Sequence, residues 1–250
     1  MPNTAIENKA HGTTNSFVEK FQDYLGEFVY GGIDGSITTF AVVAGAAGAG
    51  LDSSIIIILG FANLFADGFA MSIGAYLSSK SEKDNYDKHK KIEYWEIENL
   101  REKEIEEIRE IYQEKGFEGE LLEQVVQVII ADDDRWVDVM MKEELGMIES
   151  DKSPFKIGAI TFISFVVLGF VPLLIYVLDY FKKQDVDLLV WSSILTLAAF
   201  GIIGYLKGVV NHKNKFASTV VTILMGIVAA LVAYYVGDFL EGLVGATSSK

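Results

Sequence analysis

Five long apolar runs constrain the fold of this 250-residue chain more than any other feature. The first two carry one charged residue each and the last three carry none; they cover 28–51, 53–79, 157–178, 188–206 and 216–237. A helix needs about 20 apolar residues to cross roughly 30 Å of hydrocarbon. The last three runs could in principle fill a soluble core, but three such runs in one small chain argue against it. We therefore expect an all-α membrane protein with five transmembrane helices.

The charged residues gather between the second and third apolar runs. Residues 80–152 hold 23 of the 35 acidic and 12 of the 21 basic residues, and so carry −11 of the net charge of −14. The second run continues there as a charged helix, and glycines at 116 and 119 interrupt the pattern. We expect an insertion of three short helices, over 88–115, 120–131 and 134–147.

The basic residues predict the orientation of the chain in the membrane. With five spans, the N-terminus, the insertion and the short 207–215 loop lie on one side, and that side holds 18 of the 21 Lys and Arg residues. Cytoplasmic loops carry an excess of Lys and Arg. We therefore expect the N-terminus and the insertion to be cytoplasmic.

The N-terminal segment and the resulting division of the chain complete the expected organisation. Phe17, Phe21, Leu25 and Phe28 recur at helical spacing, which is typical of an amphipathic helix on the membrane surface or of an extension of the first span. The expected parts are an amphipathic cytoplasmic segment (1–27), two transmembrane helices (28–79), the acidic cytoplasmic domain (80–153), three transmembrane helices (154–240) and a tail (241–250).

Composition excludes several functional classes. An isoelectric point near 4.6 argues against a nucleic-acid partner, because phosphate contacts need clustered Lys and Arg. The absence of cysteine excludes disulfides, iron–sulfur clusters and thiolate zinc sites. No Gly-rich phosphate loop occurs, which argues against an ATP-driven pump. The polar first sixteen residues argue against a cleavable signal peptide.

Two acidic residues fall inside predicted spans. Asp34 and Asp67 have no Lys or Arg in their spans to pair with, and a carboxylate at membrane depth costs several kcal/mol unless water, a partner or an ion compensates it. Asp34 also lies among Gly31, Gly32 and Gly35, which let a neighbouring helix approach closely. These acids indicate a cation or proton path; the alternative is a solvated position at the membrane interface.

The second span presents possible metal ligands on one helical face. Asn63, Asp67, Met71 and Gly74 follow spacings of four, four and three residues, so they share that face. A thioether beside oxygen ligands suits a borderline transition metal such as Fe²⁺ better than Ca²⁺ or Mg²⁺. Packing toward lipid is the alternative explanation for Met71.

The insertion carries a second set of candidate ligands. At 100° per residue, four glutamates of the expected helix over 88–115 fall on one stripe beside the apolar positions 97, 100, 108 and 111: Glu93, Glu96, Glu104 and Glu107. The other glutamates share a solvated face with Lys103. Met140, Met141 and Glu144 add two thioethers and a carboxylate within about one turn. The pattern predicts a divalent-metal site, and the alternative is a charged helix that packs through the two methionines.

These motifs resemble those of the vacuolar iron transporter family. The resemblance covers about residues 26–237 and rests on residues 30–35 (YGGIDG), residues 66–78 (ADGFAMSIGAYLS) and the glutamate ladder with its Met140-Met141 partner. Members of this family have five spans, with a cytoplasmic three-helix metal-binding domain between the second and the third. Many members have Glu after the glycine of the second-span motif, whereas this chain has Ala75.

The resemblance implies a homodimer that exports Fe²⁺ from the cytosol in exchange for protons. It implies that Asp34 and Met71 line the path between the subunits, and that the cytoplasmic domain binds metal through Glu93, Glu96, Glu104, Glu107, Met140, Met141 and Glu144. Because of the departure at Ala75, Asn63 and Asp67 are provisional members of the membrane site.

We accordingly expect a dimeric transporter of Fe²⁺, and of Mn²⁺, Co²⁺ or Zn²⁺ through similar ligands, that is not an enzyme and has no prosthetic group. The expected location is a prokaryotic plasma membrane, or a vacuolar membrane in a eukaryote. A membrane-anchored, ferritin-like metal-oxidising protein is the first alternative, but that chemistry uses Glu-x-x-His pairs and none occurs. A metal-sensing protein is the second alternative, and the two intramembrane acids speak against it.

Overall fold

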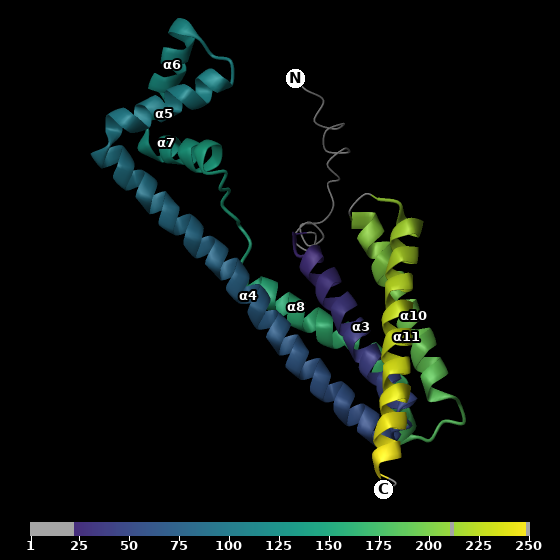
Figure 1. Cartoon of the computed structure of the whole chain (residues 1–250). Helices are drawn as coiled ribbons and strands as arrows, with labels where there is room; N and C mark the ends of the chain where they lie inside the picture. Colours follow the sequence, from purple (N-terminus) through teal and green to yellow (C-terminus); the bar gives the residue numbers. More distant parts are fainter. Residues whose placement is uncertain (1–22, 211–212, 249–250) are drawn as a thin grey trace. The chain divides into compact units, whose positions relative to one another are not determined.

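The computed structural model describes residues 23–210 and 213–248, and this described part is helical, with no strand (Figure 1). The expected amphipathic helix with Phe17 and Phe21 lies outside the described residues. The chain forms two compact units. One, here called the acidic unit, is Leu77–Lys152, and the other, the membrane unit, comprises the residues before and after it.

Five helices in the described part are long and apolar enough to cross a membrane, as predicted: Leu25–Gly48, Ser53–Asn99, Pro154–Phe181, Leu188–Val209 and Lys215–Leu243. In Figure 1 they are α3 (Leu25–Gly48), the first half of α4 (Ser53–Asn99), α8 (Pro154–Gly169) with α9 (Leu174–Phe181), α10 (Leu188–Val210) and α11 (Lys215–Ser248). Each is helical because its apolar run leaves the backbone no partner except itself in hydrocarbon.

Glycines on α3 allow close contact with α8. A Cβ atom on Gly31 would lie 2.6 Å from the carbonyl oxygen of Thr161, and one on Gly35 would collide with the backbone of Phe165. Farther along α3, Gly45 and Gly48 lie in the same way against the backbone of α11. The small-residue faces of the first span therefore pack against helices of the same chain.

Proline interrupts the third span. Pro172 lies in a short 3-10 turn, η2 (Val171–Leu173), between α8 and α9. Proline has no N–H, so it cannot donate to the carbonyl of Leu168 four residues earlier. Ser36 on α3 supplies the missing donor, because its hydroxyl donates to the Leu168 carbonyl at 2.9 Å. Buried Ser36 thus compensates for the backbone hydrogen bond that is lost at Pro172.

The acidic unit consists of the end of α4 and a helical series after it. That series is α5 (Arg101–Glu114), α6 (Gly119–Ile130), α7 (Asp133–Val139) and a π-helical turn, η1 (Met140–Glu144). The predicted break at Gly116 and Gly119 is confirmed, since both residues have positive φ angles of 92° and 59°. The core of the unit includes Ile97, Ile108, Val126 and Trp136.

The predicted continuous helix over 88–115 is wrong. The chain bends at Leu100, whose N–H donates to the Glu96 carbonyl at 2.6 Å and whose own carbonyl accepts from Lys103 and Glu104 at the start of α5. A straight 28-residue helix would extend about 42 Å, more than twice the length of α6. The bend lets both halves bury apolar side chains in one small core. Leu100, expected to face that core, is instead exposed.

Candidate metal centre

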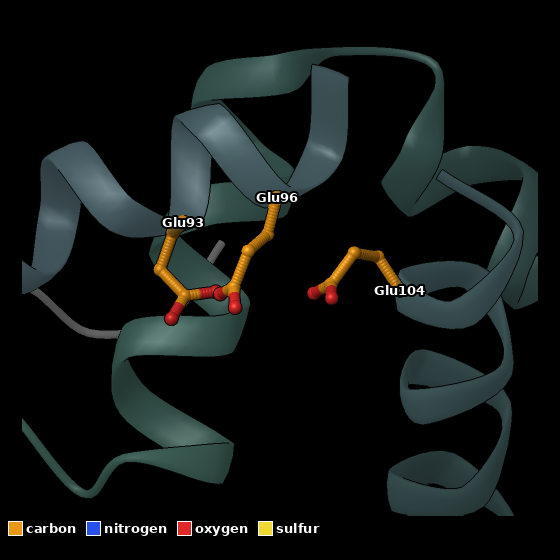
Figure 2. A group of neighbouring side chains, drawn as sticks. All are labelled: Glu93, Glu96 and Glu104. Atoms are coloured by element: carbon orange, nitrogen blue, oxygen red, sulfur yellow. The ribbon is translucent and has the colours of Figure 1, made fainter. Parts of the chain in front are cut away.

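Three glutamates meet across the bend between α4 and α5. Glu93 and Glu96 project from the last turns of α4 and Glu104 projects from α5, and their carboxylates point toward one another (Figure 2). One oxygen from each lies within 4.8 Å of the others. The sequence predicted that these side chains share a face, but the bend, rather than one straight stripe, brings them together.

Two of these carboxylates are buried with fewer hydrogen-bond partners than buried charges need. Glu93 is 3% exposed and Glu104 is 1% exposed. Among the described residues, one oxygen of Glu93 and both oxygens of Glu104 have no hydrogen-bond partner. A buried polar group without a partner costs about 1–3 kcal/mol, and a charged one costs more. The arrangement is unfavourable for three ionised carboxylates alone.

The pKa values of the cluster reflect this cost. Burial, followed by the repulsion of neighbouring carboxylates, raises the pKa of Glu93 to about 7. Burial also raises the pKa of Glu104 to about 7, with Glu107 and Glu96 as the next causes. Near neutral pH each of these two carboxyl groups is therefore only partly ionised.

Glu107 and Glu144 extend the cluster to five carboxylates. Partial desolvation of its carboxylate raises the pKa of Glu144, and the charges of Glu107 and Glu96 raise it further. The charge of Glu144 in turn acts on Glu93. All five predicted glutamates thus belong to one electrostatic group, although Glu144 itself is exposed and Glu107 is half-buried.

Met140 and Met141 occupy the core beside this group. Both are fully buried in the apolar cluster that contains Trp136 and Val137, and both lie in the π-helical turn that ends at Glu144. Packing alone accounts for their burial, as the alternative explanation held. Along the chain, Met141 lies three residues before Glu144 and Met140 lies four residues before it.

The carboxylate geometry matches what a divalent cation needs. An ion that touches two oxygens at about 2.0–2.6 Å requires those oxygens to lie no more than about 5 Å apart. The separation of at most 4.8 Å among Glu93, Glu96 and Glu104 meets this condition. An ion there would also replace the missing partners of the buried oxygens. Among the described residues, no other group of three or more such side chains meets the same geometric test.

The predicted membrane residues lie on α3 and α4. Asp34 is half-buried, Asp67 is exposed, and the two carboxylates are close enough to repel each other. The amide nitrogen of Asn63 is buried and has no hydrogen-bond partner in the described part of the chain. Met71 is half-buried and packs against the apolar cluster around Leu64 and Phe165. The structure thus places Asp34 near Asp67 and assigns Met71 a packing contact.

Lys103 is the residue of this site that sequence reasoning did not assign to it. The side chain is exposed, as expected for the solvated face, but its ammonium group also donates to Glu107 Oε1 at 2.6 Å and lies 3.9 Å from Glu104 Oε1. The i,i+4 spacing of Lys103 and Glu107 is the sequence signal that could have found it.

These features define a class: a five-span helical membrane protein with an acidic helical unit after the second span and a cluster of buried carboxylates inside that unit. Residues 25–238 match the family model described as the VIT family. The chain is 35% identical to a vacuolar iron transporter of Toxoplasma gondii, over 97% of this chain and 81% of the relative. It is 33% identical to one of Plasmodium falciparum (88% and 83%) and 34% identical to vacuolar iron transporter 1 of Arabidopsis thaliana (83% and 82%).

The chain belongs to the VIT family, and the resemblance seen in its sequence motifs is confirmed.

Proposed function

We propose that this protein transports Fe²⁺ out of the cytosol in exchange for protons, and that Mn²⁺, Co²⁺ and Zn²⁺ are accepted through the same ligands. The observation that carries the proposal is the set of three converging carboxylates with unpartnered buried oxygens. The names of the relatives, vacuolar iron transporters, support iron as the substrate. The protein is then a transporter, in which metal is cargo.

In this proposal the acidic unit is a cytoplasmic metal-binding domain. Its ligands are the five glutamates and two methionines predicted from the sequence: Glu93, Glu96, Glu104, Glu107, Met140, Met141 and Glu144. Carboxylates with pKa values of about 7 release protons when a dication binds, so capture is reversible near neutral pH. The unit captures metal from the cytosol in this proposal.

The proposed membrane path is formed by Asp34, Asp67, Asn63 and Met71. A proton or a dication held by these acids would offset the cost of placing carboxylates at membrane depth. Alternate occupation by a metal ion and by protons is the simplest way to couple their movement in opposite directions. The unpartnered amide of Asn63 is a further polar group for which an ion or water could supply a partner.

The active form is proposed to be a homodimer. The membrane-spanning window of α4 is only 22% buried, and Asp67 is exposed on it. A carboxylate that faces lipid is costly, so a second copy of the chain that covers this helix would remove the cost.

The excess of Lys and Arg on the side of the N-terminus supports a cytoplasmic N-terminus. The proposed location is a prokaryotic plasma membrane, or a vacuolar membrane if the host is a eukaryote.

Fe²⁺ uptake into proteoliposomes tests the proposal through an Asp34→Asn variant. Asn keeps the size and one oxygen but removes the charge, which lowers metal interaction by at least about 1.5–3 kcal/mol and transport by about tenfold or more. Asp52→Asn, in the exposed turn before α4, is the matched control and keeps wild-type uptake. Equal uptake by wild type and Asp34→Asn, at matched protein content, would contradict the proposed path.

A further inference from the structure

Lys103 is a cation placed at the edge of the carboxylate cluster. Its Nζ donates to Glu107 Oε1 at 2.6 Å and lies 3.9 Å from Oε1 of the fully buried Glu104. The lysine side chain itself is 64% exposed. A long, solvated side chain of this kind moves between a carboxylate and water at little cost.

The charge of Lys103 reaches most of the cluster. Its ammonium group partly offsets the upward shift in the pKa values of Glu104 and Glu144. The hydrogen bond to Glu107, together with the charges of Glu107, Glu104 and Glu96, raises the pKa of Lys103 itself, so it stays protonated. Lys103 therefore supplies part of the positive charge that the empty cluster lacks.

The same charge opposes a metal ion. An ion held by Glu93, Glu96 and Glu104 would lie within several ångströms of the ammonium group, because that group is 3.9 Å from a Glu104 oxygen. Even in a dielectric close to that of water, repulsion between a dication and an ammonium about 5 Å apart weakens binding by about tenfold. The ion and the ammonium therefore compete for the same carboxylates.

We propose that Lys103 is a tethered competitor that neutralises the empty cluster and lowers its affinity for divalent metal, so that captured metal leaves again. This inference rests on the proposed function of the cluster. A bound metal ion displaces the ammonium from Glu107, but the tether keeps the ammonium within several ångströms of the ion; when the ion leaves, the ammonium returns to Glu107. The lysine sets the affinity and the release rate and is not itself a ligand.

The chain offers a closely matched control for Lys103. Lys142 in the same unit donates to Asp138 at 2.7 Å with the same spacing of four residues, and it is similarly exposed. The charged groups that act on Lys142 are Asp138, Tyr86 and Glu143, none of which belongs to the cluster. Lys142→Gln therefore removes the same charge from the same unit without touching the metal ligands.

The test is Mn²⁺ binding to the full-length protein in detergent, by calorimetry and stopped-flow release, for wild type, Lys103→Gln, Lys103→Arg and Lys142→Gln. A pH of 8 under nitrogen lies above the pKa of Glu93 and Glu104, so protons compete little. Lys103→Gln should bind about tenfold more tightly and release Mn²⁺ correspondingly more slowly. Lys103→Arg and Lys142→Gln should stay close to wild type.

Two negative outcomes have different meanings. If wild type binds Mn²⁺ and Lys103→Gln binds it no more tightly than Lys142→Gln, the competitor role is wrong and the metal site stands. If wild type binds no Mn²⁺, the proposed function of the cluster fails, and the role of Lys103 fails with it. A gain in affinity that persists after Glu104→Gln is added would also overturn the inference, because the gain would then arise outside the cluster.

Discussion

Replacing Glu104 by glutamine should stabilise the metal-free acidic unit at alkaline pH. The carboxyl group is 1% exposed and its pKa is about 7, against 4.5 for an ordinary glutamate. Each pKa unit corresponds to 1.36 kcal/mol, so ionising Glu104 in the folded state costs about 3 kcal/mol. Glutamine has the same shape and does not ionise, so it removes this cost.

The sign of the effect depends on pH in a defined way. Below pH 4.5 the carboxyl group is protonated in both the folded and the unfolded chain, and the substitution changes little. Between 4.5 and 7 only the unfolded chain ionises fully, so the wild type progressively loses stability relative to the variant. Above pH 7 the full difference of about 3 kcal/mol should be present.

Unfolding of the full-length chain in detergent measures this difference. Trp95 and Trp136 lie in the acidic unit, so a Trp191→Phe background makes tryptophan fluorescence specific for that unit. Glu123→Gln is the control: it removes the same charge, but a hydrogen bond from Arg109 lowers the pKa of Glu123, so this variant should lose stability at pH 8. A Glu104→Gln variant that is equally stabilised at pH 4 and pH 8, or destabilised at pH 8, would refute the reasoning.

Three further variants have defined outcomes. Met71→Leu keeps the volume and removes the proposed soft ligand, so in proteoliposomes it should lower the preference for Fe²⁺ over Mn²⁺ more than it lowers total flux. An unchanged ratio would remove Met71 from the proposed path. Glu93→Gln combined with Glu96→Gln should slow Fe²⁺ transport without abolishing it, because the proposed membrane path does not include these glutamates. Complete loss of transport would show that the path depends on them. Gly31→Ala should destabilise the membrane unit by about 1–3 kcal/mol in thermal unfolding, whereas Gly26→Ala, with open space around it, should not.

Much of the membrane unit could be predicted because hydrocarbon imposes a simple length rule. Five apolar runs gave five helices, and the glycines around Asp34 correctly indicated a close helix approach. The position of Pro172 in the third run could be read from the sequence. The hydrogen bond that compensates for the proline could not, because its donor, Ser36, lies on a helix that is distant in sequence. Which helix covers which glycine face depends on tertiary contacts that periodicity does not contain.

The structure of the acidic unit could be predicted only in part from residue spacing. The convergence of Glu93, Glu96 and Glu104 was predicted, but for a straight helix, because neither glycine nor proline marks the bend at Leu100. The bend follows from the need to bury apolar side chains on both of its sides. Lys103 is exposed, as the helical projection predicted, but spacing alone did not show that its ammonium group also lies near buried Glu104.

Simultaneous measurement of Fe²⁺ flux and internal pH in proteoliposomes tests the central claim of metal–proton exchange most directly. Anaerobic liposomes with an acidic lumen, loaded with a pH dye, receive external Fe²⁺. Exchange of Fe²⁺ for protons predicts that Fe²⁺ enters faster than without the pH gradient and that the lumen becomes more alkaline in step with entry. Asp34→Asn should lower both signals together, by about tenfold or more. Fe²⁺ entry at the same rate with and without the gradient, with no change in internal pH, would contradict it.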